Sequence, residues 1–188
     1  MTSTAIHSPA PAAFTPQQGE HWIDTLNDGS PVLIRPLRAE DRDREKAFIE
    51  NLSPLTRHHR FLGEVKEVGD ALLAQLMDVD GRRRVAYVAL VHDNGTLREI
   101  GISRYAAIDT APDTCEFAVT VADDWQHKGL DAVLMHHLIA RAKDQGLRQM
   151  YSLDCPANHR MRQLATTLGF SRAIDPDDAT QVRYAIAL

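Results

Sequence analysis

Hydrophobic residues recur with two different spacings along this chain, and the spacing changes near residue 84. Before that point, apolar positions predict helices over residues 39–51, 54–61 and 69–77. A hairpin precedes them, with strands at 21–26 and 31–37 around the turn Asn27-Asp28-Gly29-Ser30. Ser53 followed by Pro54 is typical of a helix start, because serine caps the free amides and proline suits the first turn.

Strand patterns dominate the second part of the chain. Predicted strands cover 84–91, 99–107 and 115–122, then a helix over 129–145, a strand at 150–154, a helix at 158–168 and a strand at 181–187. The expected buried stripe of the first of these helices is Leu130, Val133, Leu134, Leu138 and Ala142. This order predicts a mixed α/β fold of the α+β type, in which helices flank a largely antiparallel twisted sheet.

Composition narrows the domain organisation and the partners. Residues 1–19 are rich in Ala, Pro, Ser and Thr, which predicts a flexible N-terminal arm before a single domain at 20–188. The chain has 21 Lys and Arg against 26 Asp and Glu, a net charge of −5 that argues against a nucleic-acid partner. No apolar run approaches the roughly 20 residues that cross a bilayer, so no membrane partner is expected. Two cysteines suit a reducing, cytoplasmic setting, and the adjacent histidine pairs lack the spacing of helical metal ligands.

The most informative stretch joins the predicted strand at 115–122 to the helix at 129–145. Its residues are Gln126, His127, Lys128, Gly129, Leu130 and Asp131. A loop that enters a helix N-terminus has amides without partners inside the helix, and these favour a phosphate or pyrophosphate. Gly129 allows the backbone to close on an anion, and the side chains of Gln126 and Lys128 offer further donors. The alternative is an ordinary capped helix start.

This loop resembles the acyl-CoA pyrophosphate loop of the GNAT superfamily of N-acetyltransferases. The family pattern is Gln or Arg, two free positions, Gly, one free position, and then Gly or Ala. Residues 116–121, 158–170 and 34–41 also resemble family segments, so the similarity covers about residues 32–188. A narrower similarity, in residues 52–61 and 116–126, is to the catalytic domains of bacterial protein-lysine acetyltransferases.

The resemblance implies an acyl-CoA-dependent N-acyltransferase that moves an acetyl group from acetyl-CoA to a primary amine by direct attack. The acceptor would be a protein lysine or a small amine. Glu116 would be the general base, since a carboxylate beside the cleft can take the ammonium proton and partial burial raises its pKa. An ordinary exposed strand residue is the alternative. The resemblance also allows a homodimer, because this fold often pairs through its edge strands.

The resemblance assigns the remaining cofactor contacts as well. The backbone of Phe117, Val119 and Val121 would pair with the pantetheine amides where a neighbouring strand splays away, while the side chains of Val119 and Val121 are expected in the core. Asn158 would contact the CoA arm through its amide. A helix N-cap is the alternative for Asn158, because asparagine is among the best N-cap residues.

Asp131 departs from the family pattern, which has Gly or Ala at this position. A carboxylate repels phosphates and can occupy the free amides, although Asp is also favourable in a first helical turn. Three outcomes stay open: a side chain turned to solvent, neutralisation by Lys128 or His127, or weak or lost CoA binding. The third motivates an alternative function, a non-catalytic GNAT-fold domain that senses CoA or another ligand.

Overall fold

The computed structural model describes residues 19–63, 65 and 67–188, so the arm predicted at 1–19 lies outside the described residues except for Gly19. The strands are β1 (Trp22–Thr25), β2 (Pro31–Pro36), β3 (Arg84–Asp93), β4 (Thr96–Ile108), β5 (Ala111–Val121), β6 (Gln149–Asp154), β7 (Ser171–Ile174) and β8 (Val182–Ala187). The helices are α1 (Arg42–Asn51), α2 (Pro54–Phe61), α3 (Asp70–Met77), α4 (Leu130–Asp144) and α5 (His159–Leu168), with 3-10 turns η1 (Ala39–Asp41) and η2 (Asp123–Trp125).

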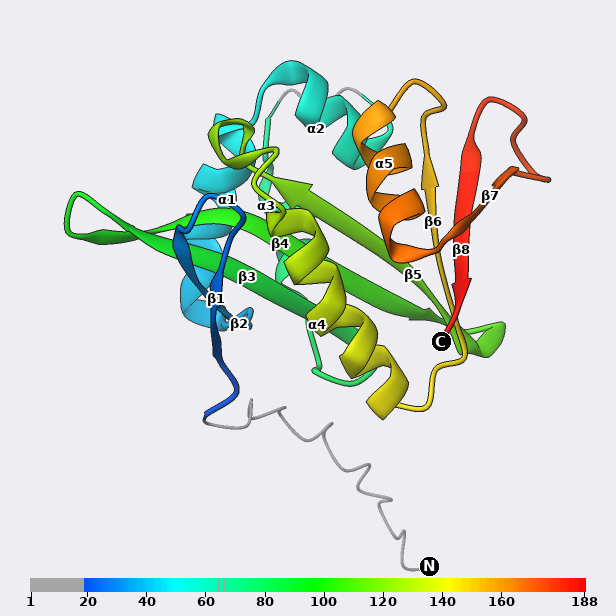
Figure 1. The fold of residues 1–188 in the computed structure, drawn as a ribbon, viewed down its shortest axis with the longest axis horizontal. Helices are drawn as coiled ribbons and strands as arrows, with labels where there is room; N and C mark the ends of the chain where they lie inside the picture. The colour runs from blue at the N-terminus through cyan, green and yellow to red at the C-terminus, as the bar shows by residue number, and fades with distance from the viewer. Residues whose placement is uncertain (1–18, 64, 66) are drawn as a thin grey trace, which may run out of the picture.

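The strands form one sheet in the order β1-β2-β3-β4-β5-β6-β8-β7 (Figure 1). Every neighbouring pair is antiparallel except β5 and β6, which run parallel and are therefore joined by a crossover through α4. The predicted mixed fold with a largely antiparallel sheet is confirmed. The unpredicted strand is β7, whose four residues are all exposed and so carry no alternating hydrophobic signal.

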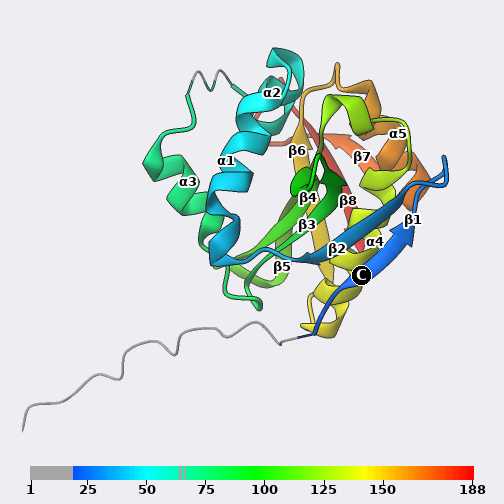
Figure 2. The same cartoon turned by 90° about the vertical axis from the view of Figure 1, so that its left-hand side faces the viewer.

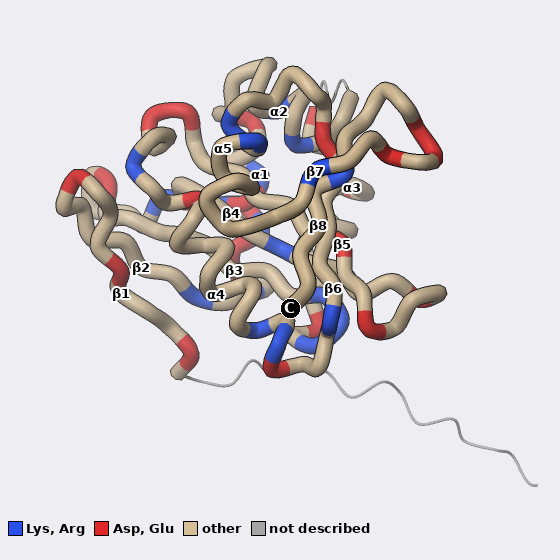
Figure 3. Tube along the Cα trace, turned by 45° about the vertical axis from the view of Figure 1, so that its right-hand side comes forward, with Lys and Arg blue, Asp and Glu red and all other residues tan. Residues whose placement is uncertain are grey.

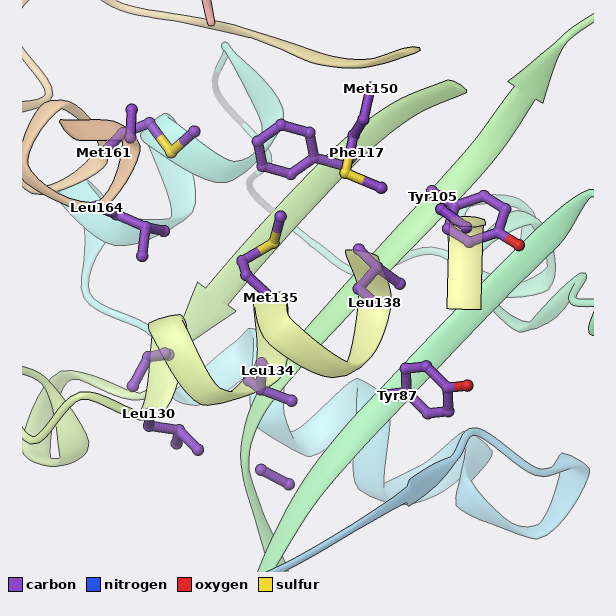
Figure 4. Close-up of a cluster of buried hydrophobic side chains, with 14 of the residues drawn as sticks. Tyr87, Tyr105, Phe117, Leu130, Leu134, Met135, Leu138, Met150, Met161 and Leu164 are labelled. Atoms are coloured by element: carbon purple, nitrogen blue, oxygen red, sulfur yellow. The ribbon is translucent and has the colours of Figure 1, made fainter. Parts of the chain in front are cut away.

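Helices cover both faces of the sheet, with α1, α2 and α3 on one side and α4 and α5 on the other (Figure 2). The predicted stripe of α4 is buried against the strands, and Leu130, Leu134 and Leu138 have no exposed surface (Figure 4). Each such leucine contributes roughly 1.5–3 kcal/mol through burial. No helix in the described part of the chain combines the length and apolar character that a bilayer crossing needs.

Acidic and basic residues are interspersed along the chain (Figure 3), and one group of them forms a charged network within the other layer, under α1. Arg35 donates to both carboxylate oxygens of Asp41 at 2.7 and 2.8 Å, and Arg104 donates to Glu45 at 2.7 Å. Glu99 is 3% exposed, and neither of its carboxylate oxygens has a hydrogen-bond partner among the described residues. Burial, and then the charges of Glu45 and Asp41, raise the pKa of Glu99 well above its ordinary value. This layer therefore favours the protonated form of Glu99.

Candidate active site

Strands β5 and β6 are paired over a short stretch and then separate. The last paired residues are Glu116 and Tyr151, whereas β4 stays paired with β5 as far as Val121. The backbone of residues 117–121 is therefore open on the β6 side. This opening lies where the sequence predicted that Phe117, Val119 and Val121 would face a splayed strand. The side chains of Phe117 and Val121 are buried, and that of Val119 is half-buried.

Three adjoining hollows follow this opening. A hollow of about 80 Å³ lies beside Val119 and Val121 and is closed by side chains of α2 and α5. It shares Asp131 and Arg160 with a second hollow of about 290 Å³ at the start of α4. It shares Arg60 with a third, of about 330 Å³, which reaches Glu116. Through these shared residues the three hollows connect the N-terminus of α4 with Glu116.

The loop before α4 has the backbone shape of an anion cradle. His127 and Gly129 have positive φ angles of 63° and 83°, so the chain turns twice before the helix begins. The positive φ of Gly129 favours glycine, and a Cβ atom there would lie 2.8 Å from the side-chain nitrogen of Asn27, so the Asn27 side chain would have to shift. Among the described residues, the amides of Leu130 and Asp131 have no protein acceptor. These amides are the donors that a diphosphate takes at a helix N-terminus.

Two side chains of this loop that were expected to donate to the ligand, Gln126 and Lys128, donate to other protein groups in this structure. The Gln126 amide nitrogen lies 3.2 Å from Asp123 Oδ1 and 3.3 Å from Thr56 Oγ1, and thus braces the loop against α2. Lys128 donates to Asp28 at 2.7 Å and lies 4.5 Å from the centroid of the Trp125 ring. Both side chains therefore hydrogen-bond within the protein and support the loop's own structure.

Asp123 holds α2 beside this loop. Its carboxylate accepts the Ser53 amide and hydroxyl at 2.8 Å and the Thr56 hydroxyl at 2.6 Å. Burial alone would raise the pKa of Asp123, but these hydrogen bonds outweigh it and lower the pKa. The predicted N-cap also forms, since Ser53 Oγ accepts the Thr56 amide at 3.2 Å. The start of α2 is therefore fixed to the end of β5.

Asp131 uses its carboxylate on its own helix. Its Oδ1 accepts the Ala132 amide at 3.0 Å. Lys128, one of the two neutralising partners expected, is paired with Asp28 instead. Arg160 on α5 supplies the nearby positive charge: burial lowers the pKa of Arg160, and the charges of Asp131 and Asp123 act against that shift. The sequence reasoning missed Arg160, because its approach to α4 depends on the packing of two distant helices.

Glu116 lies at the point where the strands part, on the sheet face covered by α2 and α3. The side chain is exposed to the 330 Å³ hollow, yet the surrounding protein displaces enough water to raise its pKa above the ordinary value. The charges of Arg183 and Arg60 oppose that rise. A carboxylate with a raised pKa beside an open cavity is suited to accept a proton.

Asn158 caps α5 and does not present a free amide. Its Oδ1 accepts the Met161 amide at 3.1 Å, while its Nδ2 donates to the two Asp154 oxygens at 3.1 and 3.0 Å. The structure therefore favours the N-cap alternative for this side chain. Asp154 lines the 80 Å³ hollow at the end of β6, and burial raises its pKa to about 6 despite hydrogen bonds from Asn158 and Cys155.

Comparison with known proteins identifies the family. Residues 39–170 match the Acetyltransferase (GNAT) family. An acetyltransferase of Pseudomonas aeruginosa is 59% identical over 177 residues, which are 94% of this chain and 95% of that protein. The GNAT domain of S. lividans PAT shares the fold with a TM-score of 0.81 and 24% identity, over 96% of this chain and 100% of that one. The yncA protein of Salmonella typhimurium, solved with acetyl-CoA, gives a TM-score of 0.66 and 21% identity, over 84% and 94% of the two chains. The chain belongs to the GNAT family of N-acetyltransferases, enzymes whose acyl donor is acetyl-CoA.

Proposed function

We propose that this chain moves an acetyl group from acetyl-CoA to a primary amine, on a protein lysine or a small molecule, by direct attack with Glu116 as the general base. The observation that carries the proposal is the separation of β5 and β6 directly after Glu116 and Tyr151. That separation leaves backbone groups of β5 free to pair with an extended ligand. The end of such a ligand would lie beside the Glu116 carboxylate. The yncA protein, which has the same fold, was solved with acetyl-CoA, and this supports acetyl-CoA as the ligand.

The residues along the path suit the parts of acetyl-CoA. The diphosphate would meet the free amides of Leu130 and Asp131 and the guanidinium of Arg160. The pantetheine amides would pair with the open backbone of residues 117–121, as a further strand pairs with a sheet. Its acyl end would then lie toward Glu116. Acetyl-CoA placed in this way is held by the backbone of the protein more than by the side chains of the loop motif.

The chemistry needs little beyond position and a proton acceptor. The thioester is already reactive, and the ammonium of the acceptor must lose a proton before its nitrogen can attack. Glu116 takes that proton, directly or through one water. The free amine then attacks the acyl carbon and displaces the thiol. General bases of this kind contribute about 10²–10⁴ in rate.

Calorimetry with acetyl-CoA, followed by a thiol-release assay across lysine peptides and small amines, tests the proposal. Binding of acetyl-CoA together with CoA release that depends on an acceptor supports it. If acetyl-CoA fails to bind, or if CoA release does not change when an amine is added, the proposal is wrong.

A second candidate function is supported by one contact. Because Asp131 already accepts the Ala132 amide, the helix N-terminus carries a negative charge where a diphosphate would bind. That contact fits a non-catalytic GNAT-fold domain that senses CoA or another ligand. The two functions differ in turnover, since a sensor binds CoA and releases no thiol with any acceptor.

A further inference from the structure

The 330 Å³ hollow beyond Glu116 combines an apolar wall with charged groups. Strands β3, β4 and β5 supply part of its apolar lining, and the end of α2, α3 and the segment after α3 supply Phe61, Leu72, Leu76 and Val79. Two of its three arginines are paired within the protein. Arg84 contacts Asp78 at 3.2 Å, and Arg104 contacts Glu45 at 2.7 Å. The remaining arginine is Arg60.

Arg60 lies where the hollow between the strands meets this cavity, since it lines both. Its guanidinium is 5.0 Å from the centroid of the Phe61 ring, which holds it in place. Among the described residues, no carboxylate and no hydrogen-bond acceptor pairs with it. Burial and then the nearby charge of Arg104 lower the pKa of Arg60 to about 10, while the charges of Glu45 and Glu116 oppose that shift. Arg60 is thus a partly buried cation that makes no direct ion pair among the described residues, and the Glu116 carboxylate is one of the two whose charges act on it.

This arrangement constrains the acceptor. A simple cationic amine approaching Glu116 would bring a second positive charge to Arg60, and burying two like charges together is unfavourable. An acceptor that also carries an anion avoids this problem, because a guanidinium binds a carboxylate through two parallel hydrogen bonds. The apolar wall then remains for a hydrophobic substituent.

We infer that the acceptor is an amine with its own carboxylate, of the class of α-amino acids with an apolar side chain. The amine would lie at Glu116, the carboxylate on Arg60, and the side chain against Phe61 and Leu76. Arg60 is then a specificity-determining residue. This inference rests on the proposed acetyl transfer and names its substrate class.

Three matched compounds test it: L-leucine, L-leucinamide and isopentylamine, with the phenylalanine series as a second set. Thiol release is measured with the wild type, Arg60→Gln and Arg183→Gln. Arg183 is the matched control, because its charge also acts on Glu116 but its guanidinium lies 3.7 Å from the Tyr151 ring centroid and does not line the cavity. We expect a KM for L-leucine at least about tenfold below that for L-leucinamide in the wild type.

Arg60→Gln should raise the KM for L-leucine about 10- to 100-fold and leave that for L-leucinamide within about twofold. Arg183→Gln should keep the leucine-to-leucinamide ratio, whatever it does to kcat through Glu116. Equal use of the acid and the amide in both series, or an unchanged ratio in Arg60→Gln, overturns the inference and leaves acetyl transfer intact. If no amine is acetylated, the proposed function fails; calorimetry of L-leucine binding to the CoA-saturated wild type and Arg60→Gln still decides the role of Arg60.

Discussion

The Asp131 carboxylate accepts the amide of Ala132, its neighbour in the first turn of α4, at 3.0 Å. This contact places a negative charge, and removes a donor, at the helix end where the open amides of Leu130 and Asp131 would receive a diphosphate. The family pattern has a small residue here. We therefore expect Asp131 to stabilise the free helix and to weaken the binding of an anion at its N-terminus.

We expect Asp131→Ala to bind acetyl-CoA about 2- to 5-fold more tightly than the wild type, as measured by calorimetry at low salt, because a charge at a helix end contributes about 0.3–1 kcal/mol. Asp131→Asn separates the two causes. It removes the charge but keeps an oxygen that can accept the Ala132 amide. Equal gains in both variants assign the effect to charge, whereas no gain in either would show that Arg160 already neutralises the carboxylate.

Glu116→Gln should lower kcat by about 10²–10⁴ while the dissociation constant of acetyl-CoA stays the same, because glutamine keeps the shape and cannot accept the proton. The pH profile gives a second test. The wild-type kcat/KM should fall as the pH drops through the Glu116 pKa, which burial raises above its ordinary value of 4.5. In the variant this acidic limb should disappear. A retained limb and normal turnover would exclude Glu116 as the base.

Gly129→Ala should lose acetyl-CoA binding. Its φ of 83° strains any other residue by about 1–2 kcal/mol, and the new Cβ would lie 2.8 Å from Asn27 Nδ2. Gly146→Ala is the matched control, since Gly146 has a φ of 79° and no heavy atom within 4 Å of the added Cβ. Both variants should lose thermal stability, but only Gly129→Ala should lose binding. Loss of binding in both would point to general destabilisation.

Glu99→Gln should stabilise the fold, and the gain should grow with pH. The raised pKa means that Glu99 holds its proton more tightly in the native state than in the unfolded state. The contribution of Glu99 to the free energy of unfolding is therefore fully present below the ordinary pKa of 4.5, and it is lost as the pH rises through the raised pKa. The gain should increase by about 1.4 kcal/mol per pH unit within that window. Urea unfolding at several pH values measures it. Glu45→Gln is the control and should destabilise the fold, because it leaves the buried Arg104 guanidinium without the negative charge of its partner. A Glu99→Gln variant with no pH-dependent gain would contradict this account.

Local patterns were enough to predict most of the elements. The period of 3.6 over Leu130, Leu134 and Leu138 and the capping by Ser53 appear in the structure as predicted. The family motif predicts an anion loop at residues 126–131, where the structure has two backbone amides without a protein acceptor. The charges around the site were not predictable, because Arg160 and Arg60 reach it from α5 and α2 only after tertiary packing. The hydrogen bonds that Gln126 and Lys128 make likewise depend on partners that lie 70 and 100 residues away in the sequence.

The tip of the β1–β2 hairpin forms one wall of the loop before α4. The backbone N–H of Asn27 donates to the backbone carbonyl of Lys128 at 3.0 Å, and the Asp28 carboxylate accepts a hydrogen bond from the Lys128 ammonium at 2.7 Å. We therefore expect ligand binding at this loop and docking of the hairpin to be thermodynamically linked. Acetyl-CoA at 100 times its dissociation constant should slow amide hydrogen exchange in β1 and β2 by up to about 100-fold, a protection that mass spectrometry can measure. Unchanged exchange would show that the hairpin opens independently of the ligand. If the hairpin is protected, bound acetyl-CoA also determines how long this edge of the sheet resists proteolysis.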